Sequence, residues 1–107
     1  DHLGCPIGAA HIIWAAWESF QRGSMLWRDD LNKVTIFYNG GGWQTVPDRW
    51  QGEPTPYRGD PPLGLRQPVR GFGWVWGRND RVFNGIGWTT DEEKGVCLKV
   101  QDFQKGF

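Results

Sequence analysis

The sequence has little of what two large functional classes need. Its formal net charge is zero, because twelve basic residues balance twelve acidic ones, whereas a protein that binds a phosphate backbone normally presents an excess of Lys and Arg. No run of apolar residues approaches the roughly 20 that a transmembrane helix requires. The sequence therefore argues against a nucleic-acid partner and predicts no membrane span.

Catalytic, metal-binding and cofactor motifs are also lacking. The glycine run 40–42 has neither the Lys nor the Ser or Thr of a phosphate loop, and no Gly-x-Ser-x-Gly element occurs. His2 and His11 with Cys5 match no usual zinc spacing. The carboxylates of residues 91–93 cluster beside a predicted turn, which favours a solvated turn. We expect no enzyme activity, no metal and no cofactor.

Cysteine is scarce, with Cys5 near one end of the chain and Cys97 near the other. A disulfide between them would stabilise the fold by on the order of 4 kcal/mol under the chain-entropy model. The alternative is a pair of buried thiols that pack as small hydrophobes. Both interpretations stay open, because two cysteines allow one pairing but do not show that it forms.

Aromatic and turn-forming residues are abundant instead. Eight of the 107 residues are Trp, more than core filling ordinarily needs, and sixteen Gly and seven Pro make up almost a quarter of the chain. That content suits short strands joined by tight turns. The length fits one domain, so residues 1–107 are predicted to form a single Trp-rich β-module.

An internal repeat gives the strongest pattern. At a shift of 83 residues, Leu3-Gly4 aligns with Ile86-Gly87, and Phe20-Gln21-Arg22-Gly23 aligns with Phe103-Gln104-Lys105-Gly106. We assign residues 3–50 and 86–107 to the two copies. The Phe anchors a strand end, and the Gly allows the chain to reverse into a hairpin.

The repeat resolves an ambiguous segment. Residues 11–17 carry apolar side chains at helical spacings, and their alanines favour a helix. Their counterparts, residues 95–101, instead alternate β-branched and polar positions. We predict strands for both segments.

Turn residues divide the remainder into further elements. The predicted fold is all-β, a small antiparallel meander that forms a compact barrel or propeller-like repeat unit with short helical turns. The Pro-rich and Gly-rich residues 51–68 form an ordered crossing between the copies, and Gly87 stops one helical turn over residues 79–85. The predicted strands outside the repeat comparison cover residues 23–28, 34–39, 43–46 and 69–76.

The first copy resembles the LGFP repeat of secreted actinobacterial proteins. The resemblance rests on Leu3-Gly4-Cys5-Pro6, on Phe20-Gln21-Arg22-Gly23 and on the pair Leu26-Trp27. It covers residues 3–27 well and 86–106 partly, since Trp88-Thr89 stands where Cys-Pro stands in the first copy. The resemblance implies attachment to, or organisation of, the cell envelope, and hence a secreted or cell-surface location.

Aromatic side chains beside polar ones suggest a carbohydrate site, because a sugar face stacks on an aromatic ring. Trp43 and Trp50 are the rings expected to be most exposed, since they flank flexible segments. Trp74 and Trp76 are expected to share one face of the predicted strand 69–76. The candidate ligand-binding residues are Trp27, Arg28, Tyr38, Trp43, Trp50, Trp74 and Trp76.

Two functions follow from these rings. The first is a non-catalytic extracellular module that binds a cell-envelope glycan or other polysaccharide. The second is a structural unit whose aromatics pack against neighbouring repeats or a protein partner in a larger assembly. Two or more coplanar rings that line a groove about one sugar unit apart favour the first function, whereas a contiguous exposed apolar patch favours the second.

Overall fold

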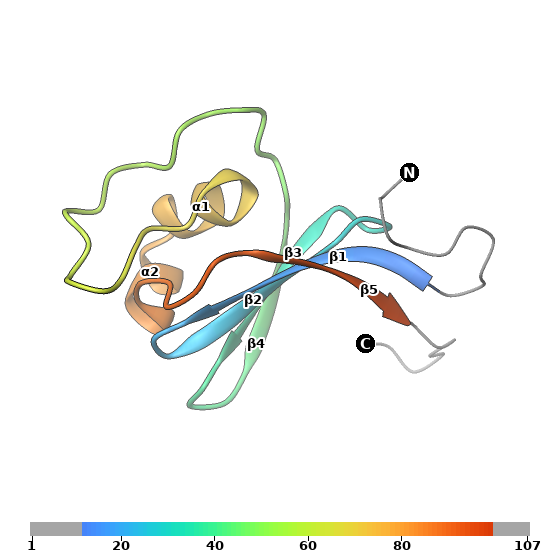
Figure 1. Ribbon diagram of the computed structural model, residues 1–107, viewed down its shortest axis with the longest axis horizontal. Helices are drawn as coiled ribbons and strands as arrows, with labels where there is room; N and C mark the ends of the chain where they lie inside the picture. The colour runs from blue at the N-terminus through green and yellow to red at the C-terminus, as the bar shows by residue number, and fades with distance from the viewer. Residues whose placement is uncertain (1–11, 100–107) are drawn as a thin grey trace.

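A computed structural model describes residues 12–99, which form one antiparallel sheet and two short helices (Figure 1). The strand order across the sheet is β4-β3-β2-β1-β5. The elements, in chain order, are β1 (Ile12–Phe20), β2 (Gly23–Arg28), β3 (Lys33–Tyr38), β4 (Trp43–Pro47), α1 (Arg70–Gly77), α2 (Asp80–Ile86) and β5 (Lys94–Lys99).

The predicted meander is confirmed in β1 to β4, where each strand pairs with the next along the chain. The strand after the triple glycine ends at Pro47, as expected of a residue without an amide donor. The strand order is linear, with β4 and β5 at the edges of the described sheet. Residues 12–99 therefore form an open sheet, and the predicted closure into a barrel or propeller-like unit is not seen within them.

The two segments predicted as strands by mutual comparison, residues 11–17 and 95–101, correspond to β1 and β5, which pair with each other. Trp14 pairs with Cys97, the residue 83 positions later. Cys97 is disulfide-bonded. Its predicted partner, Cys5, lies outside the described residues, so that pairing stays a prediction.

The predicted strand over residues 69–76 is wrong, because this segment forms the helix α1. Phe72, Val75 and Trp76 stand at helical spacing, and all three are buried. A strand would have placed Trp74 and Trp76 on one face. In the helix, Trp76 is fully buried while Trp74 is only half-buried.

The predicted helical turn is confirmed as α2. The Asn79 side chain caps its start by accepting a hydrogen bond from the Val82 amide at 3.4 Å. At its other end, Gly87 has a φ of 79°, and its amide donates to the Phe83 carbonyl at 2.9 Å. A positive φ favours Gly, which explains why α2 stops there.

The core lies between the helices and one face of the sheet. Figure 1 shows α1 and α2 on the same side of the sheet, with the loop that precedes α1 arching over them. Alternate residues of β1 to β3 point toward the helices, as the pairing register requires. The buried cluster contains Ala16, Phe20, Met25, Val34, Ile36, Phe72, Val75, Trp76, Val82 and Ile86.

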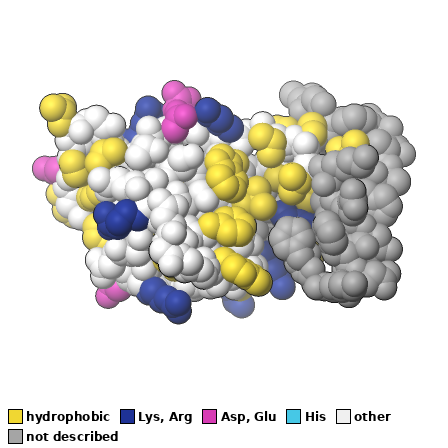
Figure 2. All heavy atoms as spheres, turned by 90° about the horizontal axis from the view of Figure 1, so that it is seen from below, with side chains coloured by type: hydrophobic (Ala, Val, Ile, Leu, Met, Phe, Trp, Pro, Cys, Tyr) yellow, Lys and Arg dark blue, Asp and Glu magenta, His cyan; other side chains and the backbone are white. Residues whose placement is uncertain are grey.

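The opposite face of the sheet, here called the open face, is not covered by α1 or α2 and carries several large apolar side chains. Trp17 is 37% exposed and Trp43 is 65% exposed. The Trp17 and Phe37 ring centroids lie 6.2 Å apart. Figure 2 shows hydrophobic side chains gathered on this underside of the molecule. By register, the large apolar side chains of the open face are Ile13, Trp17, Leu26, Phe37, Trp43, Val96 and Leu98, and polar residues such as Ser24, Thr35 and Thr45 lie among them.

Close packing of α1 against the crossing loop depends on glycine. A Cβ at Gly73 would lie 2.6 Å from the Pro68 carbonyl oxygen, so we expect Gly73→Ala to destabilise the fold by about 1 to 3 kcal/mol. Gly40 has nothing within 4 Å of the same position, so Gly40→Ala should change stability by less than about 0.5 kcal/mol. Urea denaturation measures both. Equal effects of the two substitutions would contradict the packing described here.

Candidate functional site

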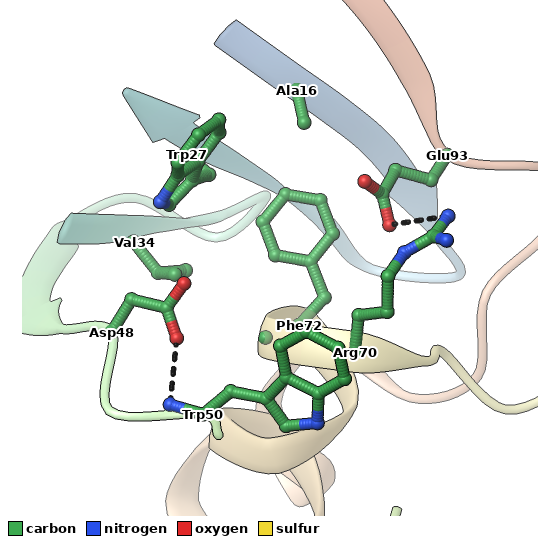
Figure 3. A pocket seen from close by; sticks show the side chains of 9 residues that line it. Ala16, Trp27, Val34, Asp48, Trp50, Arg70, Phe72 and Glu93 are labelled. Atoms are coloured by element: carbon green, nitrogen blue, oxygen red, sulfur yellow. Dashed lines mark hydrogen bonds and ion pairs between the residues drawn. The ribbon is translucent and has the colours of Figure 1, made fainter. Parts of the chain in front are cut away.

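A pocket of about 220 Å³ opens between the sheet and the first turn of α1 (Figure 3). Its apolar walls come from three aromatic rings, Trp27 of β2, Trp50 of the crossing loop and Phe72 of α1, with Ala16 and Val34 beneath them. Its charged rim consists of Asp48, Arg70 and Glu93. These residues come from both ends of the crossing loop, from the sheet and from the segment before β5.

The two indole rings are held by hydrogen bonds at their polar edges. The Trp27 Nε1 donates to Asn32 Oδ1 at 3.0 Å, and the Trp50 Nε1 donates to the Glu53 carbonyl at 2.7 Å. Both donors are thus satisfied by the protein. The two rings therefore line the pocket in fixed positions, with their apolar surfaces available for contact.

Asp48 is positioned by its own turn and by a close approach of α1. Its Oδ1 accepts a hydrogen bond from the Trp50 amide at 3.0 Å (Figure 3). A Cβ at Gly71 would lie only 2.7 Å from Asp48 Oδ2, so glycine is needed there. Val69 provides no side-chain cap for α1. The Asp48 carboxylate lies beside the first turn of α1.

Arg70 and Glu93 face each other across the rim, with Arg70 Nη2 lying 3.8 Å from Glu93 Oε1. The Arg70 side chain is 60% exposed and that of Glu93 is 22% exposed. Burial raises the pKa of the Glu93 carboxyl, Arg70 lowers it, and the negative charge of Asp48 raises it. Arg70 has a φ of 56°, a left-handed backbone conformation that residues other than Gly rarely adopt.

Glu18 is buried on the helix-facing side of β1, two residues after the pocket residue Ala16. Only 4% of it is exposed, and its Oε1 has no hydrogen-bond partner. Burial raises the pKa of its carboxyl to about 7, with a smaller opposing effect of the Thr89 hydrogen bond. The charge of Glu93 also raises this pKa and that of Arg70 lowers it, so Glu18 interacts electrostatically with the pocket rim.

The Thr89 hydroxyl has three acceptors within hydrogen-bond distance, one of which is Glu18. The Thr89 Oγ1 lies 2.8 Å from Glu18 Oε2, 3.1 Å from the Ser19 carbonyl oxygen and 2.6 Å from the Asp91 carbonyl oxygen. A hydroxyl has a single proton to donate. Its hydrogen bond to Glu18 Oε2 favours the charged carboxylate, but the larger effect of burial keeps the pKa of Glu18 raised.

Two of the seven sequence-derived candidates, Trp27 and Trp50, line the pocket. Trp43 lies on the open face, on the other side of the sheet. Arg28 is engaged in an ion pair with Asp30 at 2.7 Å. These candidates therefore do not form a single site.

The remaining three candidates lie away from the pocket. The Tyr38 hydroxyl donates to Gln44 Oε1 at 2.7 Å. The Trp74 ring carries the Arg78 guanidinium at 4.7 Å from its centroid. Trp76 is fully buried in the core, so the expectation that it stacks on a ligand is wrong.

Sequence reasoning missed the polar half of the pocket. Residues 91–93 were expected to form a solvated turn, yet Glu93 is half-buried at the rim, while Asp91 and Glu92 are exposed. Asp48 and Arg70 carry no local motif. The only signal for Asp48 is its place two residues before Trp50, which fits the side-chain-to-amide turn seen there.

Comparison of the chain with known protein families, with curated proteins and with solved structures finds no match. Among residues 12–99, no cluster of three His, Cys, Asp or Glu side chains could hold a metal ion. None of the helices in this range has the length and apolar character needed to cross a membrane.

The buried Glu18 should make stability depend on pH. Its folded-state pKa of about 7 exceeds the ordinary 4.5, so the native state binds more protons between these values, and stability falls as pH rises through this range. Glu18→Gln abolishes this titration and keeps an acceptor for Thr89. Its stability relative to wild type should rise by up to about 3 kcal/mol between pH 4.5 and 7, then level off.

Urea denaturation at several pH values measures this difference. Glu92→Gln is the matched control, since the Glu92 side chain is 73% exposed. Its stability should follow that of the wild type across the range. A constant difference between Glu18→Gln and wild type over the same pH values would contradict the assignment of a buried, titrating Glu18.

Proposed function

We propose that the protein is a non-catalytic extracellular module that binds a cell-envelope glycan or other polysaccharide, with one sugar unit held in the aromatic pocket. The observation that carries this proposal is the pocket itself, in which three ring faces meet three charged side chains. At about 220 Å³ it is smaller than the roughly 300 to 1,000 Å³ of sites for drug-sized ligands. That size suits a single ring unit of a longer chain.

The lining matches the chemistry of a sugar. The apolar face of a pyranose stacks on an indole, and its hydroxyls need acceptors and donors at the edge. Asp48 and Glu93 supply carboxylate acceptors, and the guanidinium of Arg70 supplies donors. The rings of Trp27 and Trp50 are already fixed by their own hydrogen bonds, which lowers the entropy lost on binding.

Two observations support an extracellular location. Cys97 is disulfide-bonded, and disulfides persist mainly in oxidising compartments outside the cytosol. The resemblance of residues 3–27 to LGFP repeats implies the cell envelope as the place of action. Both fit a module that acts on an envelope polysaccharide.

Removal of a pocket ring tests the proposal. Trp50→Ala should abolish retention of the protein on an insoluble envelope glycan, because it removes a stacking surface worth about 1 to 3 kcal/mol. Trp43→Ala removes an equally large ring from the open face and should retain wild-type binding. Circular dichroism checks that both variants are folded. Loss of binding in Trp43→Ala alone would move the glycan site to the open face and overturn the pocket assignment.

The open face supports a second candidate function, an assembly unit that packs against another protein or a neighbouring repeat. Soluble monomers rarely expose large contiguous apolar patches. The open face carries Trp17 and Trp43 across strands β1 to β4, with the Phe37 ring beside Trp17. This face lies opposite the pocket, so the two functions are compatible in one molecule.

Self-association tests this second function. The double substitution Trp17→Ser and Trp43→Ser should abolish any concentration-dependent dimer that the wild type forms, as measured by sedimentation velocity. It should leave glycan retention intact, because neither ring lines the pocket. A wild-type protein that stays monomeric at high concentration would count against self-assembly through the open face.

A further inference from the structure

We propose that the sugar unit in the aromatic pocket carries a protonated amino group, so that the ligand is an amino sugar without an N-acetyl group. This inference rests on the proposed function and specifies the chemical class of its ligand. Three features of residues 12–99 carry it: aromatic rings without a stacked cation, an excess of negative charge at the rim, and a carboxylate oxygen with no hydrogen bond.

Among residues 12–99, some rings of the protein carry a stacked arginine, and those of the pocket do not. Elsewhere, three arginines lie over rings: Arg58 over Phe83 at 4.8 Å, Arg78 over Trp74 at 4.7 Å and Arg81 over Tyr38 at 5.8 Å. In the part of the chain that the structure describes, no Lys or Arg lies over Trp27, Trp50 or Phe72 in this way. Their electron-rich faces are thus open to a cation from outside.

The rim has one more negative than positive charge. Asp48 and Glu93 face a single Arg70, whose 3.8 Å separation from Glu93 is too long for a hydrogen bond. Asp48 Oδ1 accepts the Trp50 amide, whereas no hydrogen bond to Oδ2 is found within residues 12–99. An ammonium between the two carboxylates would satisfy this oxygen and relieve the repulsion between them.

A third carboxyl, that of Glu18, lies near the pocket rim without lining the pocket. Glu18 is more than nine-tenths buried with its Oε1 unpartnered, and its electrostatic neighbours include Glu93 and Arg70. An anionic sugar would meet the two carboxylates of Asp48 and Glu93 in the pocket. An N-acetylated sugar would replace the ammonium by a neutral amide and lose both the ionic and the cation–π attraction.

Binding measurements with three matched oligosaccharides test the charge requirement. Titration calorimetry at about pH 6.5, below the usual pKa of an amine, compares a glucosamine oligomer, the N-acetylglucosamine oligomer of equal length and a glucose oligomer. We expect the glucosamine oligomer to bind about tenfold or more tightly than the other two, which corresponds to about 1.4 kcal/mol.

Equal binding of the acetylated or glucose oligomer would overturn the inference and leave the proposed glycan function standing. Failure of all three oligomers to bind would also overturn it, and glycan retention with Trp50→Ala would then decide the proposed function separately. Tetramethylammonium provides a cation without a sugar ring. If it bound as tightly as the glucosamine oligomer, the ligand would be a simple ammonium compound and the amino-sugar assignment would fall.

Charge substitutions at the rim give effects of opposite sign. Asp48→Asn and Glu93→Gln should each weaken binding of the glucosamine oligomer by about fivefold to tenfold, while Arg70→Gln should strengthen it, because a like charge is removed. Asn at position 48 keeps the acceptor for the Trp50 amide. Arg66→Gln is the matched control, since Arg66 is 57% exposed and outside the pocket, and it should bind as wild type. Weaker binding by Arg70→Gln would show that repulsion between Arg70 and the ligand is not the dominant effect of this residue, and would contradict the inference.

Discussion

The burial of Trp76 holds the helical layer in place. This ring is completely buried, and its Nε1 donates to the Gly87 carbonyl at 2.7 Å. It packs edge-on against Phe83 and Trp88, each with its ring centroid 5.1 Å from that of Trp76. A buried indole N–H without an acceptor would be costly. The position of α1 is therefore tied to the residue at which α2 ends.

The pocket depends on this connection. After Gly87 the chain returns to β1, where the Gln21 amide donates to the Trp88 carbonyl at 3.0 Å and the Thr90 amide donates to the Ser19 carbonyl at 3.0 Å. This path brings Glu93 to the pocket rim before β5 begins. The same helix that carries Trp76 places Phe72 and Arg70 over the sheet. The burial of Trp76 thus helps to position both Arg70 and Glu93, although Trp76 itself does not line the pocket.

The sequence predicted the sheet better than the site, for physical reasons. Strands β2 to β4 are short segments separated by turn-forming residues, a local pattern that the tertiary structure leaves unchanged. Helix α1 was missed because its three glycines disfavour a helix and its alternating aromatics resemble a strand, while the burial of Phe72 and Trp76 decides the conformation. Asp48, Arg70 and Glu93 meet only in three dimensions, so no spacing along the chain connects them.

Several energetically unfavourable features gather around the same cavity. Glu18 and Glu93 have carboxyls desolvated by burial, and Arg70 holds a left-handed backbone conformation at the start of α1. Each costs stability, by about 1 to 3 kcal/mol for a residue in a sparsely populated backbone region. Elsewhere the residue types suit the local structure: Asn79 caps the start of α2, and Gly87 adopts the positive φ at its end. Residues with unfavourable burial or backbone conformation that cluster in one place are typical of a functional site rather than of a structural core. This clustering favours the pocket over the open face as the ligand site, because the open face, although apolar and exposed, consists of regular strand positions without a buried charge.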